Sequence, residues 1–409
     1  MRARRVAVTG MGLVTPIGNS PDSFFDRLAG GHSGIGRHPD PSIDQAVGVV
    51  SHDLSRHFTA LQRMDMDRVS LLSLLAAQQA LDMSGLAGQA PLGETAGVFF
   101  GTGAGCIGSV EQAYAGYFGT GRRQSQLLPI LSAMSHAPAS QVALRFGIKG
   151  ESQTYSIGCS SSAVAIGEAF RRIHDGYLDC AVAGGGESML TPGVMKSWQA
   201  LRVLCSDPPG APGTGCRPFS ADRSGFALGE GAGFVVLEEM EKARSRGAVV
   251  IAELAGYGVS NDACHLSRPQ IQGQVLAMQR ALDAGHVNPG RIGYINANGI
   301  GTHAGDVAET RAIKQVFGQK AWKIPVSSTK SAHGHLIGAA GAVEFIASLM
   351  ALARQVVPPT THWTCADPDC DLDYVPGTGR KVRGLKYVMS NSFAFGGTNA
   401  SLVARRFDA

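Results

Sequence analysis

The chain alternates short runs of apolar residues with longer segments that have a helical pattern of apolar and small residues. The first apolar run covers residues 6–12 and leads into a glycine-rich stretch, so we interpret it as the first strand of a sheet. Strands that alternate with helices along a whole chain are typical of α/β proteins, in which helices cover a sheet. The pattern therefore predicts an α/β fold.

The pattern changes after the charged stretch 238–246, although no Pro/Ser-rich linker divides the chain there. We expect two interlocked α/β halves, residues 1–246 and 247–409, packed as one unit. The first half closes on the glycine-rich segment 229–237, and the second closes similarly on 395–404. This similarity indicates an internal duplication.

Residues 336–353 form an apolar segment that is long enough to resemble a membrane span. Glu344 lies in its middle, and small residues are concentrated at 338–342. We interpret the segment as a buried helix packed closely against another backbone, and we expect no membrane insertion.

The composition narrows the functional classes. Of 409 residues, 44% are hydrophobic, 17% are charged and 54 are glycine, which favours a globular chain with many tight turns over disorder. The formal charge of +4 is too weak and too dispersed for a nucleic-acid surface, whereas an acidic protein partner remains compatible with it.

The eight cysteines show no paired CxxC spacing, which argues against a disulfide framework and against a zinc site. The basic N-terminus has only a short apolar stretch before its first glycine, unlike a signal peptide. We expect reduced thiols and a cytoplasmic location.

Cys159 lies where an apolar run turns sharply into a helix of small residues that ends near Gly176. This arrangement is that of a nucleophile placed between a strand and a helix. Unpaired N–H groups at the start of the helix favour thiolate over thiol, so we expect a lowered pKa at Cys159 and covalent acyl chemistry. An inert buried cysteine is the alternative, and we retain it for the other cysteines.

Three further segments concentrate polar groups after predicted strands: residues 296–306, 328–335 and 391–399. In α/β sheets, the loops that leave the carboxyl ends of strands are where sites assemble. We therefore expect these loops to converge on Cys159.

Four sequence blocks occur in the order and spacing of one family. They are Gly158-Cys159-Ser160-Ser161, residues 217–223 (RPFSADR), Lys330-Ser331 with Gly334-His335, and residues 391–399 (NSFAFGGTN). Over essentially its full length, the chain resembles the elongating β-ketoacyl-acyl-carrier-protein synthases of the thiolase superfamily. The resemblance implies a thiolase fold, in which two pseudo-repeated halves form a five-layered αβαβα core.

The resemblance also implies a mechanism. Cys159 accepts an acyl chain from a phosphopantetheine thioester, and a malonyl carrier then decarboxylates and attacks the acyl-enzyme to give a 3-oxoacyl thioester. The N–H groups of Cys159 and Phe395 form an oxyanion hole, Phe395 gates the second substrate, and His335 donates to the malonyl carbonyl. Lys330 corresponds to the family's buried lysine and Glu309 to its acidic partner.

Further positions follow from the same resemblance. Asp306 is a supporting carboxylate, Thr302 and Thr398 fall where the family contacts the pantetheine arm, and Phe393 is a candidate substrate contact. No metal or other cofactor is implied beyond the phosphopantetheine of an acyl carrier protein. We expect a homodimer or a ketosynthase heterodimer.

The chain departs from the family in the first polar loop. The family has Asn-Ala-His-Gly-Thr, whereas this chain has Asn298 at the histidine position and Ile300 at the threonine position. An amide can donate a hydrogen bond, but it cannot take a proton or carry positive charge. Decarboxylation should therefore suffer more than acyl transfer, unless His303 or His333 supplies the missing imidazole.

Ala104 occupies a position where related long-chain enzymes carry a bulkier residue, which favours a deeper acyl pocket. Basic residues at the expected carrier-docking positions are Arg63, Arg68, Arg122, Arg123 and Arg202. Such charges raise the association rate and set orientation, and ordinary solvated arginines are the alternative.

Two other functional classes stay open, and a third is disfavoured. A transacylase or a non-decarboxylative enzyme that forms C–O or C–N bonds fits Asn298, and so does a partner subunit like the chain-length factors, although Cys159 argues against that subunit. The glycines at 103, 105 and 108 formally match a dinucleotide fingerprint. However, the expected acidic residue is absent from 118–131, so we interpret these glycines as close packing around the acyl pocket.

Overall fold

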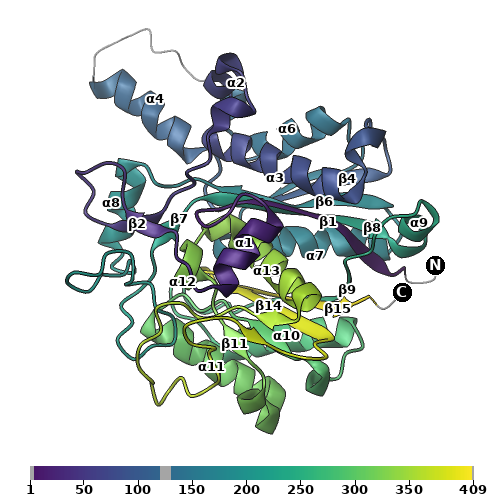
Figure 1. Cartoon of the computed structure of the whole chain (residues 1–409). Coiled ribbons are helices and arrows are strands. Elements are labelled where there is room, and N and C mark those ends of the chain that lie inside the picture. Colours follow the sequence, from purple (N-terminus) through teal and green to yellow (C-terminus); the bar gives the residue numbers. More distant parts are fainter. Residues whose placement is uncertain (1–3, 120–129, 408–409) are drawn as a thin grey trace.

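The computed structural model describes residues 4–119 and 130–407 (Figure 1). Its main feature is a ten-stranded sheet of order β11-β10-β14-β15-β9-β1-β8-β6-β4-β5. The first half of the chain provides β1 (Val6–Val14), β4 (Ala96–Gly101), β5 (Ser152–Tyr155), β6 (Cys180–Glu187) and β8 (Gly231–Glu239). The second half provides β9 (Ala252–Asn261), β10 (Tyr294–Asn296), β11 (Val326–Ser327), β14 (Tyr387–Phe393) and β15 (Thr398–Arg406).

The two five-stranded groups meet where β1 and β9 pair antiparallel over three residues. From that seam outward, the strand order of one group mirrors that of the other, with β8, β6, β4 and β5 opposite β15, β14, β10 and β11. In both groups the two outermost strands pair in parallel and the two innermost strands pair antiparallel.

Helices form three layers around these two groups of strands (Figure 1). Helices α3 (Arg68–Ser84) and α6 (Ala137–Phe146) cover the outer side of the first group, and α10 (Ile271–Ala284) and α11 (His303–Phe317) cover the outer side of the second. Between the groups lie α7 (Ser161–His174) and α13 (Ala340–Arg354). The five-layered αβαβα arrangement predicted from the sequence is confirmed.

The remaining α-helices and strands lie around this core. They are α1 (Pro21–Ala29), α2 (Ala60–Asp65), α4 (Ile107–Gly119), α5 (Ile130–Ala133), α8 (Pro192–Ala200), α9 (Met240–Ser245), α12 (Lys330–His333), β2 (Ile35–Arg37), β3 (Ala46–Gly48), β7 (Leu228–Gly229), β12 (Val356–Val357) and β13 (Arg380–Lys381).

Helix α13 belongs to the apolar segment that resembles a membrane span. The stretch Ile337–Arg354 has the length and mean hydropathy of a span, but 89% of it is buried inside the fold. It contacts α7 in the middle layer and strands of both groups. A core helix accounts for its apolar composition.

Glycines let the outer helices approach the sheet in both halves. A Cβ atom built on Gly10 or Gly12 of β1 would lie 2.0–2.1 Å from a carbonyl oxygen of α3. A Cβ atom on Gly256 or Gly258 of β9 would lie 2.1 Å from a carbonyl oxygen of α10. The two innermost strands therefore pack against their helices backbone to backbone, in the same way in each half.

This packing gives the first testable prediction. The variant Gly258→Ala should destabilise the fold by about 1–3 kcal/mol, because the added methyl group forces α10 away from β9. Denaturant unfolding at one fixed protein concentration measures the change, with Gly88→Ala as the control because its Cβ would meet nothing within 4 Å. Equal stability of the two variants would contradict the prediction.

Candidate active site

Cys159 lies at a sharp turn between β5 and α7. Gly158 adopts a left-handed conformation (φ +61°), which glycine tolerates without strain, and α7 begins two residues after the cysteine. The Ser161 hydroxyl donates to the carbonyl oxygens of Gly158 (2.7 Å) and Thr102 (3.0 Å) and accepts from the N–H of Ile157 (2.8 Å). These bonds hold the turn against the loop after β4.

His335 lies beside the cysteine, with Nε2 3.0 Å from Sγ. The N–H of Ile337 donates to Nδ1 of the same ring (3.2 Å), so Nδ1 carries no proton and the neutral ring carries it on Nε2. Burial, assisted by the charge of Lys330, lowers the pKa of His335 well below its ordinary value. His335 is therefore a neutral hydrogen-bond donor that points at the sulfur.

The pKa of Cys159 differs from the sequence expectation. Burial raises it to about 11, although the charge of Lys330 and hydrogen bonds from the N–H groups of Phe395 and Cys159 act in the opposite direction. The predicted lowering was wrong because the side chain is almost completely enclosed, and burial penalises the thiolate more than its donors favour it. The free enzyme therefore holds a thiol at neutral pH.

The two backbone N–H groups that act on the sulfur belong to the residues proposed for the oxyanion hole. Cys159 supplies one N–H group from the turn between β5 and α7. Phe395 supplies the other from the loop between β14 and β15. Two donors directed at one point are suited to stabilise a developing oxyanion.

Lys330 is completely buried at the start of α12. Its Nζ donates to the carbonyl oxygen of Asn298 (2.6 Å) and lies 2.5 Å from Oε1 of Glu344. The sequence analysis assigned Glu309 as the acidic partner, but the ion pair is formed with Glu344. The signal for it was present, because Glu344 is the single charge in the apolar segment 336–353.

Glu309 instead fixes the loop that carries Asn298. Its carboxylate accepts from the N–H groups of Asn298 (2.9 Å) and Gly299 (2.8 Å). Burial raises the pKa of Glu309 and of Glu344 to about 7, while Lys330 opposes both shifts. The main chain of Asn298 is thus held between an acid and a lysine.

The side chain of Asn298 lines a cavity of about 390 Å³. Only 6% of the residue is exposed, and its amide oxygen has no hydrogen-bond partner among the described residues. Other predicted positions around the cavity are Arg202, Ile300, Thr302, His303, Phe393 and Phe395. Ala104 and Thr398 are not among its lining residues.

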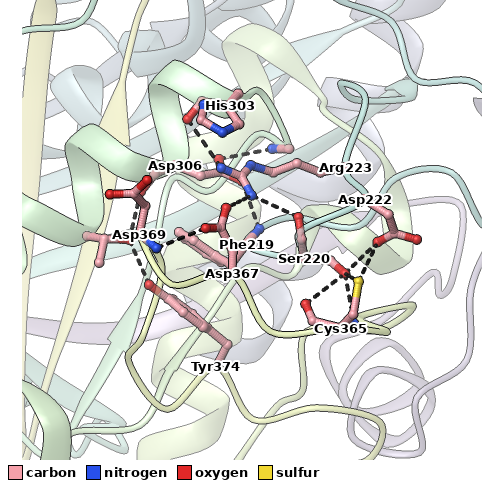
Figure 2. Close-up of polar contacts among 12 residues, drawn as sticks. Phe219, Ser220, Asp222, Arg223, His303, Asp306, Cys365, Asp367, Asp369 and Tyr374 are labelled. Carbon is pink, nitrogen blue, oxygen red and sulfur yellow. Dashed lines mark hydrogen bonds and ion pairs between the residues drawn. The ribbon is translucent and has the colours of Figure 1, made fainter.

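Asp306 and Arg223 belong to a polar cluster next to this cavity, and Arg223 is one of its lining residues (Figure 2). The Asp306 carboxylate accepts from the N–H groups of Phe219 (2.7 Å) and Gly301 (3.1 Å), and burial raises its pKa to about 6. The Arg223 guanidinium lies between Asp306 (3.4 Å) and Asp367 (2.5 Å). This cluster ties the 217–223 segment to the loop of Asn298.

The two substitute histidines occupy different places. His333 is buried, and its ring nitrogens contact the carbonyl oxygen of Gly334 (2.8 Å) and the hydroxyl of Thr329 (3.1 Å). Burial lowers its pKa to about 3. His303 is exposed at the start of α11 and lines the same cavity as Asn298. Only His303 is placed to meet a ligand there.

The candidate docking arginines differ in whether their side chains are free to meet a partner. Arg63 on α2 and Arg202 after α8 are exposed. Arg68 donates to both carboxylate oxygens of Glu230 (2.6 and 2.8 Å), so its guanidinium is already occupied. Arg122 and Arg123 lie outside the described residues.

Comparison with known proteins assigns the family. The N-terminal domain model of the beta-ketoacyl synthases matches residues 3–243, and the C-terminal domain model matches residues 251–364. The chain belongs to the beta-ketoacyl synthase family, and it is a condensing enzyme, of the acyltransferase class, of fatty-acid or polyketide synthesis.

Two relatives match almost end to end. Nodulation protein E of Rhizobium meliloti (strain 1021) is 40% identical over 407 residues, which cover 98% of this chain and 99% of the relative. The 3-oxoacyl-[acyl-carrier-protein] synthase 2 of Vibrio cholerae serotype O1 is 38% identical over 414 residues, which cover 99% of this chain and all of the relative. The family uses no cofactor beyond the phosphopantetheine of its carrier.

A similar solved structure is that of a type II PKS acyl-carrier protein in complex with its ketosynthase bound to the hexaketide. The match has a TM-score of 0.91 at 30% identity and covers 99% of this chain and 100% of the other. The thiolase fold expected from the sequence is confirmed.

The buried ion pair gives the second prediction. The variant Lys330→Met should lower the free energy of unfolding by about 3–5 kcal/mol, because it leaves the Glu344 carboxylate buried without its cation. The double variant Lys330→Met/Glu344→Gln should recover much of that loss, since both charges are then removed. Denaturant unfolding of the two variants and of Glu344→Gln completes the cycle, and additive losses would contradict the pairing.

Proposed function

We propose that this enzyme loads an acyl chain onto Cys159 and extends it by decarboxylative condensation with a malonyl carrier, with Asn298 acting where the family has histidine. The observation that carries the proposal is the convergence on the Cys159 sulfur of the Nε2–H of His335 and the N–H groups of Cys159 and Phe395. These groups serve a thiol nucleophile and a carbonyl oxygen, the two components of thioester exchange.

In the loading step, the Cys159 sulfur attacks the thioester carbonyl of the acyl carrier. The two backbone N–H groups stabilise the oxyanion, the bond to the pantetheine sulfur breaks, and the proton of the Cys159 thiol leaves with that sulfur. No residue other than the cysteine needs to gain or lose a proton. Loading is therefore compatible with the neutral state of His335 and with an amide at position 298.

In the extension step, the bond between the malonyl carboxylate and its α-carbon breaks, and CO₂ leaves. The resulting enolate oxygen accepts hydrogen bonds from His335 Nε2–H and from the amide of Asn298, while the α-carbon attacks the acyl carbonyl. The Cys159 sulfur leaves and regains a proton from water. A neutral amide stabilises the enolate less than an imidazole that can carry charge, so we expect extension to be slower than loading.

A second function is favoured by the same amide. If Asn298 does not support CO₂ release, the acyl-enzyme passes its chain to another acceptor, and the protein is a transacylase or a non-decarboxylative coupling enzyme. A partner-subunit role, like that of the chain-length factors, would instead leave Cys159 unacylated.

The third prediction separates these functions. Incubation with an acyl carrier should add the acyl mass to Cys159, and a malonyl carrier should then remove it with release of one CO₂ per extension. Intact-protein mass spectrometry and CO₂ detection follow both steps, with Cys159→Ala as the control. An adduct without CO₂ would establish the transfer function, and no adduct would favour the partner-subunit role.

The variant Asn298→His extends this test. It should accelerate extension by roughly 10²-fold and leave the rate of Cys159 loading unchanged, because an imidazole adds charge only where the enolate develops. Loading and extension rates that change together would show that residue 298 acts on the nucleophile instead.

We further propose that an acyl carrier protein docks through Arg63 on α2 and Arg202 after α8, and Arg122 and Arg123 stay candidate contacts from the sequence. Arg63 and Arg202 are exposed, as a docking residue must be.

We also propose a dimer, as a homodimer or a ketosynthase heterodimer, because β5 is an edge strand and α4 exposes Tyr114, Tyr117 and Phe118. We expect the enzyme to act in the cytoplasm.

The fourth prediction tests the docking surface. Charge reversal in Arg63→Glu should raise KM for carrier-bound acyl substrate several-fold and leave loading from a small thioester unchanged, because a rim charge acts mainly on encounter with an acidic protein. Steady-state kinetics at low and high salt measure the effect. Arg244→Glu is the control, since Arg244 is exposed on α9, far along the sheet from α2 (Figure 1). Equal effects of the two reversals would reject the surface.

A further inference from the structure

Three buried side-chain amides line the cavity in front of Cys159: those of Asn298, Asn399 and Gln274. Asn399 is bonded within the protein, since its amide nitrogen donates to Oδ1 of Asp262 (2.8 Å) and to the carbonyl oxygen of Gly397 (3.1 Å). Within residues 4–119 and 130–407, the Asn298 and Gln274 side chains form no hydrogen bond, and both amide oxygens are buried without a partner. Two of the three amides thus lack a partner.

Gln274 lies on the first turn of α10 and is 2% exposed. A buried amide that forms no hydrogen bond destabilises a fold, and most such groups in proteins are paired. An apolar side chain of the same length would fill this place without that penalty. The presence of a polar residue here is explained if a ligand that enters the cavity forms a hydrogen bond with the Gln274 amide.

The position of the cavity narrows the choice of ligand. Phe395 lines it, and the N–H of Phe395 hydrogen-bonds the Cys159 sulfur, so the cavity reaches a residue that contacts the nucleophile. Exposed Arg202, Arg268 and His303 form part of its wall, so it also reaches the surface. A ligand that joins the surface to the sulfur must be long and thin.

The chemistry of the Gln274 side chain narrows the choice of ligand further. A primary amide both donates and accepts, so its best complement is another amide, which offers one N–H and one carbonyl oxygen. The pantetheine arm of a carrier-bound thioester is a flexible chain that contains two secondary amides. It matches both the path and the hydrogen-bonding pattern.

We propose that Gln274 is a substrate-binding residue, whose side-chain amide hydrogen-bonds an amide of the pantetheine arm and so sets the depth at which the thioester meets Cys159. The inference rests on the proposed function only in that thioesters enter through this cavity. It applies to the loading step as much as to extension, and it does not depend on Asn298 supporting decarboxylation.

The fifth prediction uses Gln274→Met, which keeps the length of the side chain and removes its polar atoms. The second-order rate of Cys159 loading from an acyl-pantetheine thioester should fall about five- to tenfold, the loss of one uncharged hydrogen bond. Loading from the corresponding S-ethyl thioester, which has no amide, should not change. A direct contact requires that the loss of loading rate occur only when the thioester carries the pantetheine arm.

Two further measurements exclude a structural cause. Gln272→Met makes the same substitution on the same turn of α10, where Gln272 is exposed and bonds Gln315 (3.2 Å), and it should change neither loading rate. The unfolding temperature of Gln274→Met should equal or exceed that of the unmodified enzyme, because the variant removes an unsatisfied buried amide. A residue that only supports the fold would lower it.

The inference is overturned if Gln274→Met slows loading from both thioesters equally, slows neither, or lowers the unfolding temperature. Calorimetric binding of free pantetheine tests the same contact without any chemistry, and Gln274→Met should weaken it by the same five- to tenfold. An enzyme that binds pantetheine through Gln274 but does not extend an acyl chain would support this inference and reject the proposed condensation.

Discussion

The active site depends on one buried positive charge. Lys330 has no exposed side-chain surface, and removing an ammonium group from water is costly unless opposite charge and hydrogen bonds replace its hydration. Here Glu344 on α13 and the carbonyl oxygen of Asn298 replace it. The lysine thereby fixes three elements to one another: the helix after β11, the core helix α13 and the loop after β10. Its charge also adds to the lowering of the pKa of His335 by burial and opposes the rise that burial causes in the pKa of Cys159.

The site exists only because the two halves pack closely in the middle layer. The first half contributes Cys159, whereas the second half contributes His335, Lys330, Asn298 and the N–H of Phe395. A Cβ atom on Gly341 of α13 would lie 2.8 Å from atoms of Ala163 in α7, and one on Gly338 would lie 2.2 Å from the nitrogen of Gly103. Larger residues at these two glycine positions would move the turn that carries Cys159 away from the hydrogen-bond donors around the sulfur. The small residues that the sequence places at 338–342 are thus a condition for catalysis as well as for the fold.

Local patterns in the sequence were sufficient for the α/β class and for the loops that surround Cys159, whereas the five layers followed from the family resemblance. They were insufficient wherever tertiary burial decides. The pKa of Cys159 was expected to fall from its helix position, but enclosure of the sulfur reverses the direction. Glu309 was taken as the partner of Lys330, and only the packing of α13 shows that Glu344 forms the ion pair. Gln274 was missed because nothing in a helical pattern tells which glutamine faces a cavity.

The groups around the sulfur share one property, which explains how an amide can stand at position 298. His335 is neutral, its proton is fixed on Nε2 by the N–H of Ile337, and the oxyanion donors are backbone N–H groups. Such a site stabilises charge with fixed hydrogen-bond donors rather than by passing protons. The peptide of Asn298 is held from both sides by Lys330 and Glu309, and in the proposed mechanism its side-chain amide supplies one more neutral donor. An amide cannot become charged, and in the proposed mechanism that matters only while the enolate exists. We therefore expect Asn298 to affect extension and to leave loading intact.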